Sequence, residues 1–317
     1  MARHNFAMAS LLWALLLTSV GCSNAGSQSN GTVPQRPNAP DARFAAYWNQ
    51  GKGEITRYAL EQARYGEIRS GDAVLIFVTE DFRGDKQVKL ESDPAGKDVI
   101  PVLKLNLTKK FTTGIYPYSM MTSVFTPVAL APDTRAIKIT TSSQEWCGHT
   151  WTQFNLRGGK YDVQEHSYFE NEADLAFPMD AAMPEDEVWA RIRIAPGTLP
   201  IGDISVIPGT MTARLRHIQP AVEPATAVMT VLPADSTGAK LARYSLTYAN
   251  SGRSLAIDFE TEFPHRIMGW SETYKDGFGP KAVMLTTRAV RTNSLMIDYW
   301  TKNSTADDSL RMELGLR

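Results

Sequence analysis

Cysteine is nearly absent from this chain, whose 317 residues include only Cys22 and Cys147. Two cysteines exclude the disulfide-dense framework of small secreted domains. An excess of charge of one sign is lacking too, since 33 Lys and Arg face 34 Asp and Glu. This balance excludes a disordered acidic tail and a nucleic-acid binder held by phosphate contacts, so we expect no nucleic-acid partner.

Recognisable catalytic and cofactor motifs are missing as well. The chain has no His-Glu-x-x-His, no paired Cys-x-x-Cys, no Gly-x-Ser-x-Gly, no phosphate-binding Gly-x-x-x-x-Gly-Lys-Ser/Thr and no Ca²⁺ loop. We therefore expect no cofactor and assign no metal ligand. What the chain does have is 43% hydrophobic and 9% aromatic residues, enough for a buried core. The sequence thus predicts a globular protein without naming its activity.

The first residues have the layout of a secretory signal. Arg3 and His4 precede the apolar run Leu11 to Leu17, which is too short to span a bilayer and is followed by small residues. The segment from Thr18 to Cys22 looks like a bacterial lipobox, although Ser19 stands where leucine is usual. In such a segment the cysteine becomes the first mature residue and is acylated. We therefore expect residues 1–21 to be a signal peptide.

The acylated Cys22 would anchor the protein to a membrane of the bacterial cell envelope. Ser23 favours sorting to the outer membrane, with the protein facing the periplasm. Residues 22–41 would form the lipidated cysteine and a flexible polar tether, spanning about 25 Å for a Gly- and Ser-rich linker of this length. The body would then divide into a first β-rich half, residues 42–215, and a second, residues 216–317.

Alternating apolar and polar residues predict strands through most of the body. The pattern is clean in Val99 to Leu107 and around Leu255, Ile257 and Phe259, and it also predicts a strand at Ala190, Ile192 and Ile194. Ala73 to Thr79 is nearly continuous in apolar residues, which predicts a strand covered on both faces. Ile55 to Ile68 fits either a helix or a strand.

These patterns favour an all-β fold of antiparallel curved sheets, or a barrel-like one, with few short helices. Arg157-Gly158-Gly159-Lys160 predicts a tight hairpin, because two glycines supply the positive φ angles of the turn. Two related halves are an alternative, since Arg57-Tyr58-Ala59-Leu60 is echoed by Arg243-Tyr244-Ser245-Leu246. The other alternative is a single continuous antiparallel sheet system that runs through the whole body.

The densest group of reactive side chains is Glu145, Cys147 and His149. On a strand these would share a face, so His149 could activate Cys147 as a nucleophile while Glu145 orients the base. The alternative is structural, because a free cysteine is among the most often buried residues and Gly148 is typical of a bulge. A metal site would need further ligands beyond Cys147 and His149, for which Glu145, Glu165, His166 and Glu170 are the candidates.

The segment Gly114 to Phe125 packs aromatic residues and methionines closely without charge. Tyr116, Tyr118, Met120 and Met121 suit an apolar ligand, because tyrosine is amphipathic and methionine adapts its shape. The alternative is a buried strand.

Several stretches of the body resemble a family of Gram-negative envelope lipoproteins that has no established activity. They are Tyr65-Gly66-Glu67, Val78 to Phe82, Lys109 to Met121 and Thr141 to Thr150. Members are sometimes filed under a septum-formation-inhibitor (Maf) name, but true Maf proteins are cytosolic and open with a Ser-x-Ser-x-Arg-Arg motif that this chain lacks. The resemblance implies an envelope location and no particular chemistry.

Two functions follow as hypotheses. The first is a lipid-anchored, non-catalytic protein that binds an apolar or envelope-derived ligand or an envelope protein. The second is an envelope hydrolase or transferase that uses Cys147 with His149 as base.

Overall fold

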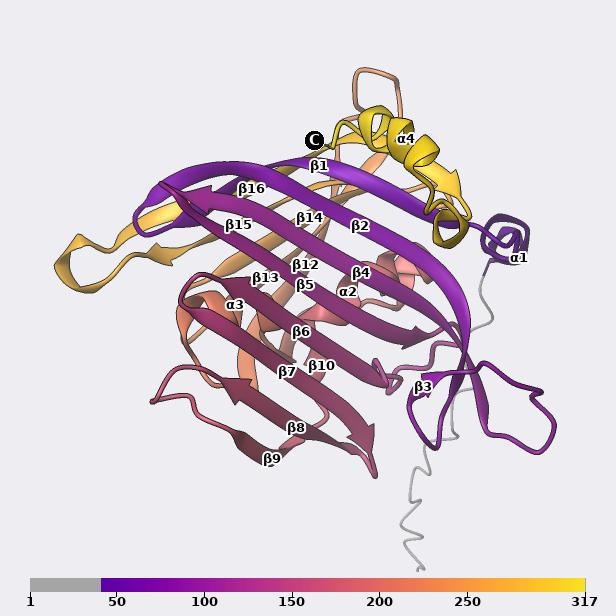
Figure 1. Ribbon diagram of the computed structural model, residues 1–317, viewed down its shortest axis with the longest axis horizontal. Coiled ribbons are helices and arrows are strands. Elements are labelled where there is room, and N and C mark those ends of the chain that lie inside the picture. Colours follow the sequence, from indigo (N-terminus) through magenta and orange to yellow (C-terminus); the bar gives the residue numbers. More distant parts are fainter. Residues whose placement is uncertain (1–40, 317) are drawn as a thin grey trace, which may run out of the picture. The chain divides into compact units, whose positions relative to one another are not determined.

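The computed structural model describes residues 41–316, which belong to one compact unit (Figure 1). The expected signal peptide, Cys22 and nearly all of the expected tether lie outside the described residues, so the proposed anchor stays a prediction. None of the helices in the described part of the chain has the length and apolar character needed to cross a membrane.

The described residues form sixteen strands and four short α-helices. The strands are β1 (Gly53–Arg64), β2 (Glu67–Arg83), β3 (Val88–Lys89), β4 (Val99–Thr113), β5 (Tyr116–Pro127), β6 (Lys138–Glu145), β7 (Gly148–Arg157), β8 (Lys160–Ser167), β9 (Leu175–Asp180), β10 (Met183–Pro184), β11 (Gly202–Ile207), β12 (Glu223–Leu232), β13 (Leu241–Tyr248), β14 (Ser254–Glu260), β15 (Ile267–Asp276) and β16 (Val283–Ile297). The helices are α1 (Arg43–Trp48), α2 (Glu185–Ile194), α3 (Thr210–Arg216) and α4 (Asp308–Glu313), with short 3₁₀ turns at Pro196–Thr198, Gly279–Lys281, Tyr299–Thr301 and Thr305–Asp307.

All sixteen strands belong to one curved, unclosed sheet (Figure 1). Its order is β10-β11-β12-β13-β14-β15-β16-β1-β2-β4-β5-β6-β7-β8-β9, with β3 paired to β2, and every pair except β10 with β11 is antiparallel. Strands β1 and β16 pair inside the sheet, while its two edges, β9 and β10, are joined by residues 181–182. The expected all-β, antiparallel fold is confirmed.

Helix α2 lies inside the curve of the sheet, between β4 and β5 on one side and β15 on the other. All ten of its residues are buried. The main hydrophobic core joins α2 and α3 to the inward side chains of the strands, including Tyr58, Leu105, Phe154 and Ile257. The inside of the sheet is therefore filled by the protein's own helices.

The expected strand at Ala190, Ile192 and Ile194 is wrong, because these residues lie on α2. The sheet surrounds this helix, so no face of it is exposed to water. Its sequence therefore lacks the alternation of apolar and polar faces that identifies an amphipathic helix. Its alternating arginines are buried in ion pairs: Arg191 with Glu187 and Arg193 with Glu54.

Other local expectations hold. Ile55 to Ile68, whose sequence fits either a helix or a strand, forms most of strand β1, the hairpin turn and the start of β2. The Gly158-Gly159 turn joins β7 to β8 with both φ angles positive. Strand β2 is largely buried from Ala73 to Val78, since α2 and the inner core cover one face and the C-terminal segment covers part of the other through Leu314.

Candidate functional site

Five connections at one end of the sheet each expose a large apolar side chain. Alternate turns of an antiparallel meander lie at the same end, and the connections β1–β2, β4–β5, β6–β7, β8–β9 and β15–β16 lie along the left side in Figure 1. Their exposed residues are Tyr65, Ile115, Trp146, Tyr168 and Phe278, each between 43% and 82% exposed. We call these five residues the apolar rim. Helix α1, where the described chain begins, lies at the opposite end.

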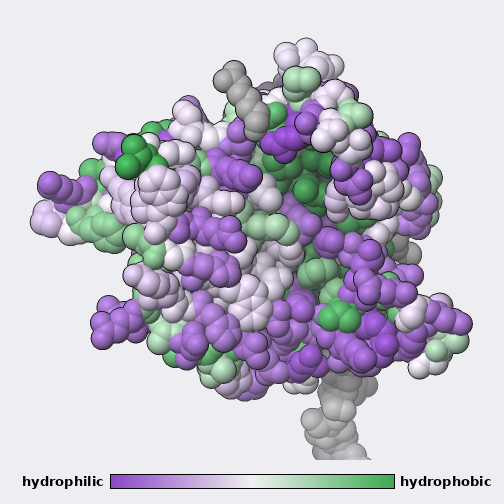
Figure 2. Space-filling view, viewed as in Figure 1, coloured by the Kyte–Doolittle hydropathy of each residue, from purple (hydrophilic) through white to green (hydrophobic). Residues whose placement is uncertain are grey.

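The rim stands out against a polar surface. Figure 2 shows mostly hydrophilic side chains on the face seen there, with apolar patches that include the end carrying the hairpin tips. Isolated exposed apolar residues are ordinary, but a row of them on consecutive tips marks an interaction surface more often than a free one.

The β1–β2 tip has a strained backbone. Tyr65 and Gly66 form a two-residue turn with φ angles of +59° and +77°. Such turns favour Asn-Gly, and a bulky residue in the left-handed region is uncommon. The Tyr65 side chain folds back over the sheet end, where its hydroxyl lies 2.7 Å from that of Tyr118.

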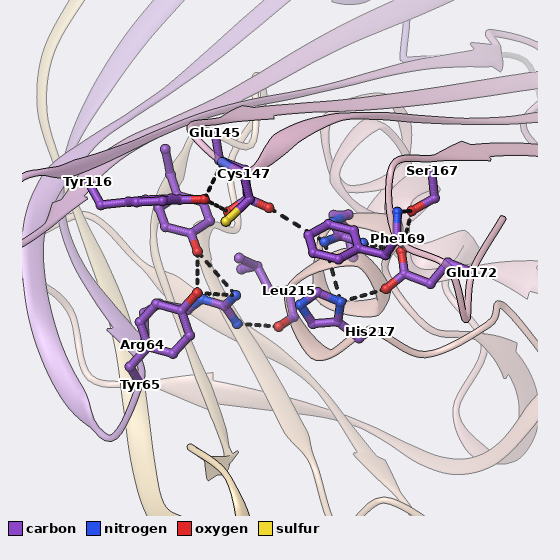
Figure 3. A network of polar contacts seen from close by, with 12 residues as sticks. Arg64, Tyr65, Tyr116, Glu145, Cys147, Ser167, Phe169, Glu172, Leu215 and His217 are labelled. Atoms are coloured by element: carbon purple, nitrogen blue, oxygen red, sulfur yellow. Dashed lines mark hydrogen bonds and ion pairs between the residues drawn. The ribbon is translucent and has the colours of Figure 1, made fainter.

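Beneath this tip, Arg64 links three elements (Figure 3). Its guanidinium donates to the hydroxyls of Tyr65 and Tyr118, each at 3.2 Å, and to the backbone carbonyl of Leu215 in α3. Burial raises the pKa values of Tyr118 and, on the neighbouring tip, Tyr116 above the ordinary tyrosine value. Both phenols therefore stay protonated, and that of Tyr116 donates a hydrogen bond to Glu145.

A second set of bonds links the β4–β5 and β6–β7 tips (Figure 3). The Tyr116 hydroxyl donates to Glu145 Oε2 at 2.9 Å and accepts the backbone N–H of Cys147 at 2.6 Å. The other Glu145 oxygen lies 3.6 Å from Arg214 of α3. The Tyr116 ring also packs beside the rim residue Trp146, with 6.0 Å between centroids.

The β8–β9 connection joins the same network through Glu172. This carboxylate pairs with Arg214, lies 2.5 Å from His217 Nδ1 and accepts the Ser167 hydroxyl at 2.7 Å. Burial works to raise the pKa of Glu172, but the bonds from Ser167 and His217 and the charge of Arg214 lower it overall. Bonds from the tips of separate hairpins thus converge on α3.

The three residues of the nucleophile hypothesis do not lie on one strand face. Cys147 is in the two-residue turn between Glu145 and Gly148, and its exposed side chain contradicts the structural alternative of a buried, bulged strand. His149 is exposed on β7, and no hydrogen bond joins it to Cys147. Glu145 is directed to Tyr116 and Arg214. Among residues 41–316, no side chain is hydrogen-bonded to the Cys147 thiol.

The four residues expected to bind an apolar ligand separate between the two faces of β5. Tyr118 and Met120 are buried in the core, Met121 is partly exposed on the other face, and Tyr116 lies in the network described above. Tyr118 and Met120 therefore belong to the buried strand that was the alternative prediction. Tyr116 instead packs beside the rim residue Trp146.

The pocket beside α2 and α3 is small. It measures about 30 Å³ and is lined by both apolar and charged groups, among them Trp189, Trp270 and Lys109. A space of this size takes one water molecule and no lipid chain. A wider surface pocket of about 650 Å³ lies beside α1, with Phe44, Thr79 and Pro101 in its wall. In the described range 41–316, no group of three or more His, Cys, Asp or Glu residues is placed to hold a metal ion.

Sequence reasoning found Tyr116, Glu145 and Cys147 but missed Arg64, Phe278, Arg214 and His217. These residues reach the rim from distant segments, so no spacing in the sequence connects them. One signal was available: Tyr65-Gly66, Gly114-Ile115 and Trp146-Cys147 are all turns within the stretches that carry the family resemblance. Comparison of the chain with family models, with curated proteins and with solved structures gives no match.

Proposed function

We propose that the protein is a non-catalytic binding protein of the bacterial cell envelope, tethered through Cys22, that binds anionic envelope lipid with its apolar rim. The observation that carries this proposal is the row of exposed Trp, Tyr, Phe and Ile side chains on consecutive tips. Aromatic residues with a polar edge favour the boundary between lipid headgroups and acyl chains.

Lysines at two of the five tips favour an anionic surface over a neutral one there. Lys110 and Lys275 are exposed beside the β4–β5 and β15–β16 tips, and neither forms an ion pair with another described residue. Cations beside an apolar edge add to lipid binding when the lipid is anionic.

Rigidity supports a binding role as well. The rim rests on the bonded network of Arg64, Tyr116, Glu145, Glu172 and Arg214. A surface that is already ordered loses little conformational entropy on binding. By contrast, an enzyme built on Cys147 would need a general base beside the thiol, and no described residue is hydrogen-bonded to it in that role.

Vesicle co-sedimentation of the mature chain without its acyl anchor, residues 23–317, tests the proposal. We expect the protein to bind vesicles that contain phosphatidylglycerol, and Ile115→Ser with Phe278→Ser to weaken this binding by about tenfold or more. Val231→Ser is the matched control, because Val231 is 81% exposed against 82% for Ile115 but lies on β12, away from the rim.

All variants should keep their stability within about 0.5 kcal/mol, because each removes an exposed side chain. Failure of the unsubstituted chain to bind vesicles would refute the proposal. So would an equal loss of binding in Val231→Ser and the rim variants.

A further inference from the structure

A surface pocket of about 150 Å³ lies between the β1–β2 tip, the β15–β16 tip and the end of α3. Its wall includes Arg64, Arg216 and Lys275, one carboxylate, Asp276, and the rim residues Tyr65 and Phe278. Three cations against one carboxylate leave a formal charge of +2 in this wall. The pocket therefore combines positive charge with two members of the apolar rim.

Arg64 is the unusual member of this wall, because it is a buried cation without an acidic partner. The residue is 4% exposed, and its hydrogen bonds go to two tyrosine hydroxyls and one carbonyl. Its Nε is buried and has no hydrogen-bond partner among the described residues. Buried charges in proteins are normally paired, so an unpaired guanidinium in a pocket wall indicates an anion site.

The other charges leave this positive potential in place. Neither Arg216 nor Lys275 has an ion-pair partner within residues 41–316. Asp276 is the opposing charge, and one of its oxygens already accepts the backbone N–H of Gly66 at 2.6 Å. Every other buried arginine of the inner core, Arg191, Arg193 and Arg253, pairs with a glutamate.

The strained turn shapes one side of the pocket. Tyr65 stacks on Arg64, with 4.2 Å from the guanidinium carbon to the ring centroid, and its ring lies 6.1 Å from that of Phe278. Figure 3 shows the Tyr65 ring and the Arg64 guanidinium side by side at the sheet end. A bulky residue held in the left-handed region is a strain that proteins keep mainly at functional sites.

We propose that this pocket binds a phosphate group, with Arg64, Arg216 and Lys275 as its ligands and Tyr65 and Phe278 beside the group that carries the phosphate. A guanidinium offers parallel N–H donors that match phosphate oxygens, and lysine adds a mobile ammonium. The proposal rests on the proposed binding function and names its ligand chemistry. The phosphate can belong to a lipid headgroup or be free in solution, and the experiment separates these sources.

The test uses the mature chain, residues 23–317, with Arg216→Gln and Lys275→Gln combined. Both side chains lie at the surface, so the double variant is expected to fold. Lys281→Gln is the matched control, since Lys281 is an exposed lysine on the same hairpin that does not line the pocket. Affinity is measured for inorganic phosphate, for glycerol phosphate, and for vesicles of phosphatidylcholine with and without phosphatidylglycerol.

We expect vesicles with phosphatidylglycerol to bind more tightly than neutral ones, the double variant to lose about tenfold in this affinity, and Lys281→Gln to keep it. Glycerol phosphate should compete with the vesicles. If only the soluble phosphates bind, and the double variant abolishes that binding, the site stands while the lipid proposal fails. If vesicles bind through the rim with equal affinity for all charge variants, the phosphate site is refuted while the binding function stands. Equal losses in the double variant and Lys281→Gln would also refute the site.

Discussion

Asp186 is the buried acid of α2 that lacks a paired cation. Around it, Arg253 bonds to Glu185 at 2.6 Å and to Glu272 at 2.7 Å, and Lys109 lies 3.9 Å from Glu272. Asp186 instead accepts the backbone N–H and the hydroxyl of Thr210, at 3.0 and 2.9 Å. Burial raises the pKa of Asp186 from 3.8 to about 7. The charged form is therefore disfavoured inside the protein.

This shift predicts a loss of stability as the pH rises. Between about pH 4 and 7 the folded protein keeps a proton on Asp186 that the unfolded chain has released, so the free energy of unfolding falls with increasing pH across this window. Asp186→Asn keeps an acceptor for Thr210 and cannot ionise. We expect the variant to lose less stability than the unsubstituted protein between about pH 5 and 8, as measured by urea unfolding.

The comparison is internally controlled because other titrating groups are the same in both proteins. Asp180→Asn is the matched control, since Asp180 is an exposed aspartate on β9 and its removal should leave the pH dependence unchanged. Parallel pH profiles for Asp186→Asn and the unsubstituted protein would show that Asp186 ionises normally.

At the scale of elements, α2 is held to the sheet by a buried ion pair. Arg193 donates to both oxygens of Glu54 on β1, at 2.6 and 2.8 Å, and the two side chains are 1% and 5% exposed. Removing only the cation leaves a buried carboxylate, which typically costs about 3–5 kcal/mol. We expect Arg193→Met to lose about this much free energy of unfolding in urea titrations.

The double variant Arg193→Met with Glu54→Gln should recover part of that loss, because no buried charge is left unpaired. Arg243→Met serves as the control: Arg243 also pairs with a carboxylate, that of Asp258, but its side chain is 42% exposed, so the loss should be much smaller. If the two single losses at Arg193 and Glu54 simply add, the pair does not act as described.

The strands with one face exposed to water could be predicted from the sequence, whereas the buried helix α2 could not. Leu103, Leu105 and Leu107 face inward on β4, and Leu255, Ile257 and Phe259 do so on β14, as their alternation predicts. Helix α2 is covered on all sides and gives no period. Its acidic first turn, Glu185 to Glu187, and its basic last turn were the remaining signal, because this arrangement complements the helix dipole.

The site shows the same limit of sequence reasoning. Tyr116 and Glu145 lie on neighbouring hairpins and were singled out for their residue types, but their bond to each other depends on the pairing of β5 with β6. Arg64 and Leu215 are 151 positions apart and meet only because α3 packs under the β1–β2 tip. Residue types identified candidates, whereas the sheet order determined which of them meet.

The whole molecule is organised around strands from both ends of the chain. Strand β16 pairs with β1 from Gly53 and Ile297 to Glu61 and Arg288. Helix α2 contacts β4 and β5 from the first expected half and β15 from the second. The rim is shared in the same way, since Phe278 belongs to the second half and its four other members to the first. Neither half contains the complete rim or the complete core.

We therefore expect the mature chain to unfold in one cooperative transition, with equal calorimetric and van't Hoff enthalpies. Leu60→Ala on β1 and Ile257→Ala on β14 remove fully buried side chains from different halves. Each should cost about 2–5 kcal/mol and move the whole transition to lower temperature, because α2 and the β1–β16 pairing couple the halves. Two resolved transitions in scanning calorimetry, with Ile257→Ala moving only one of them, would show that the halves unfold independently and that the rim can lose Phe278 while its other members stay folded.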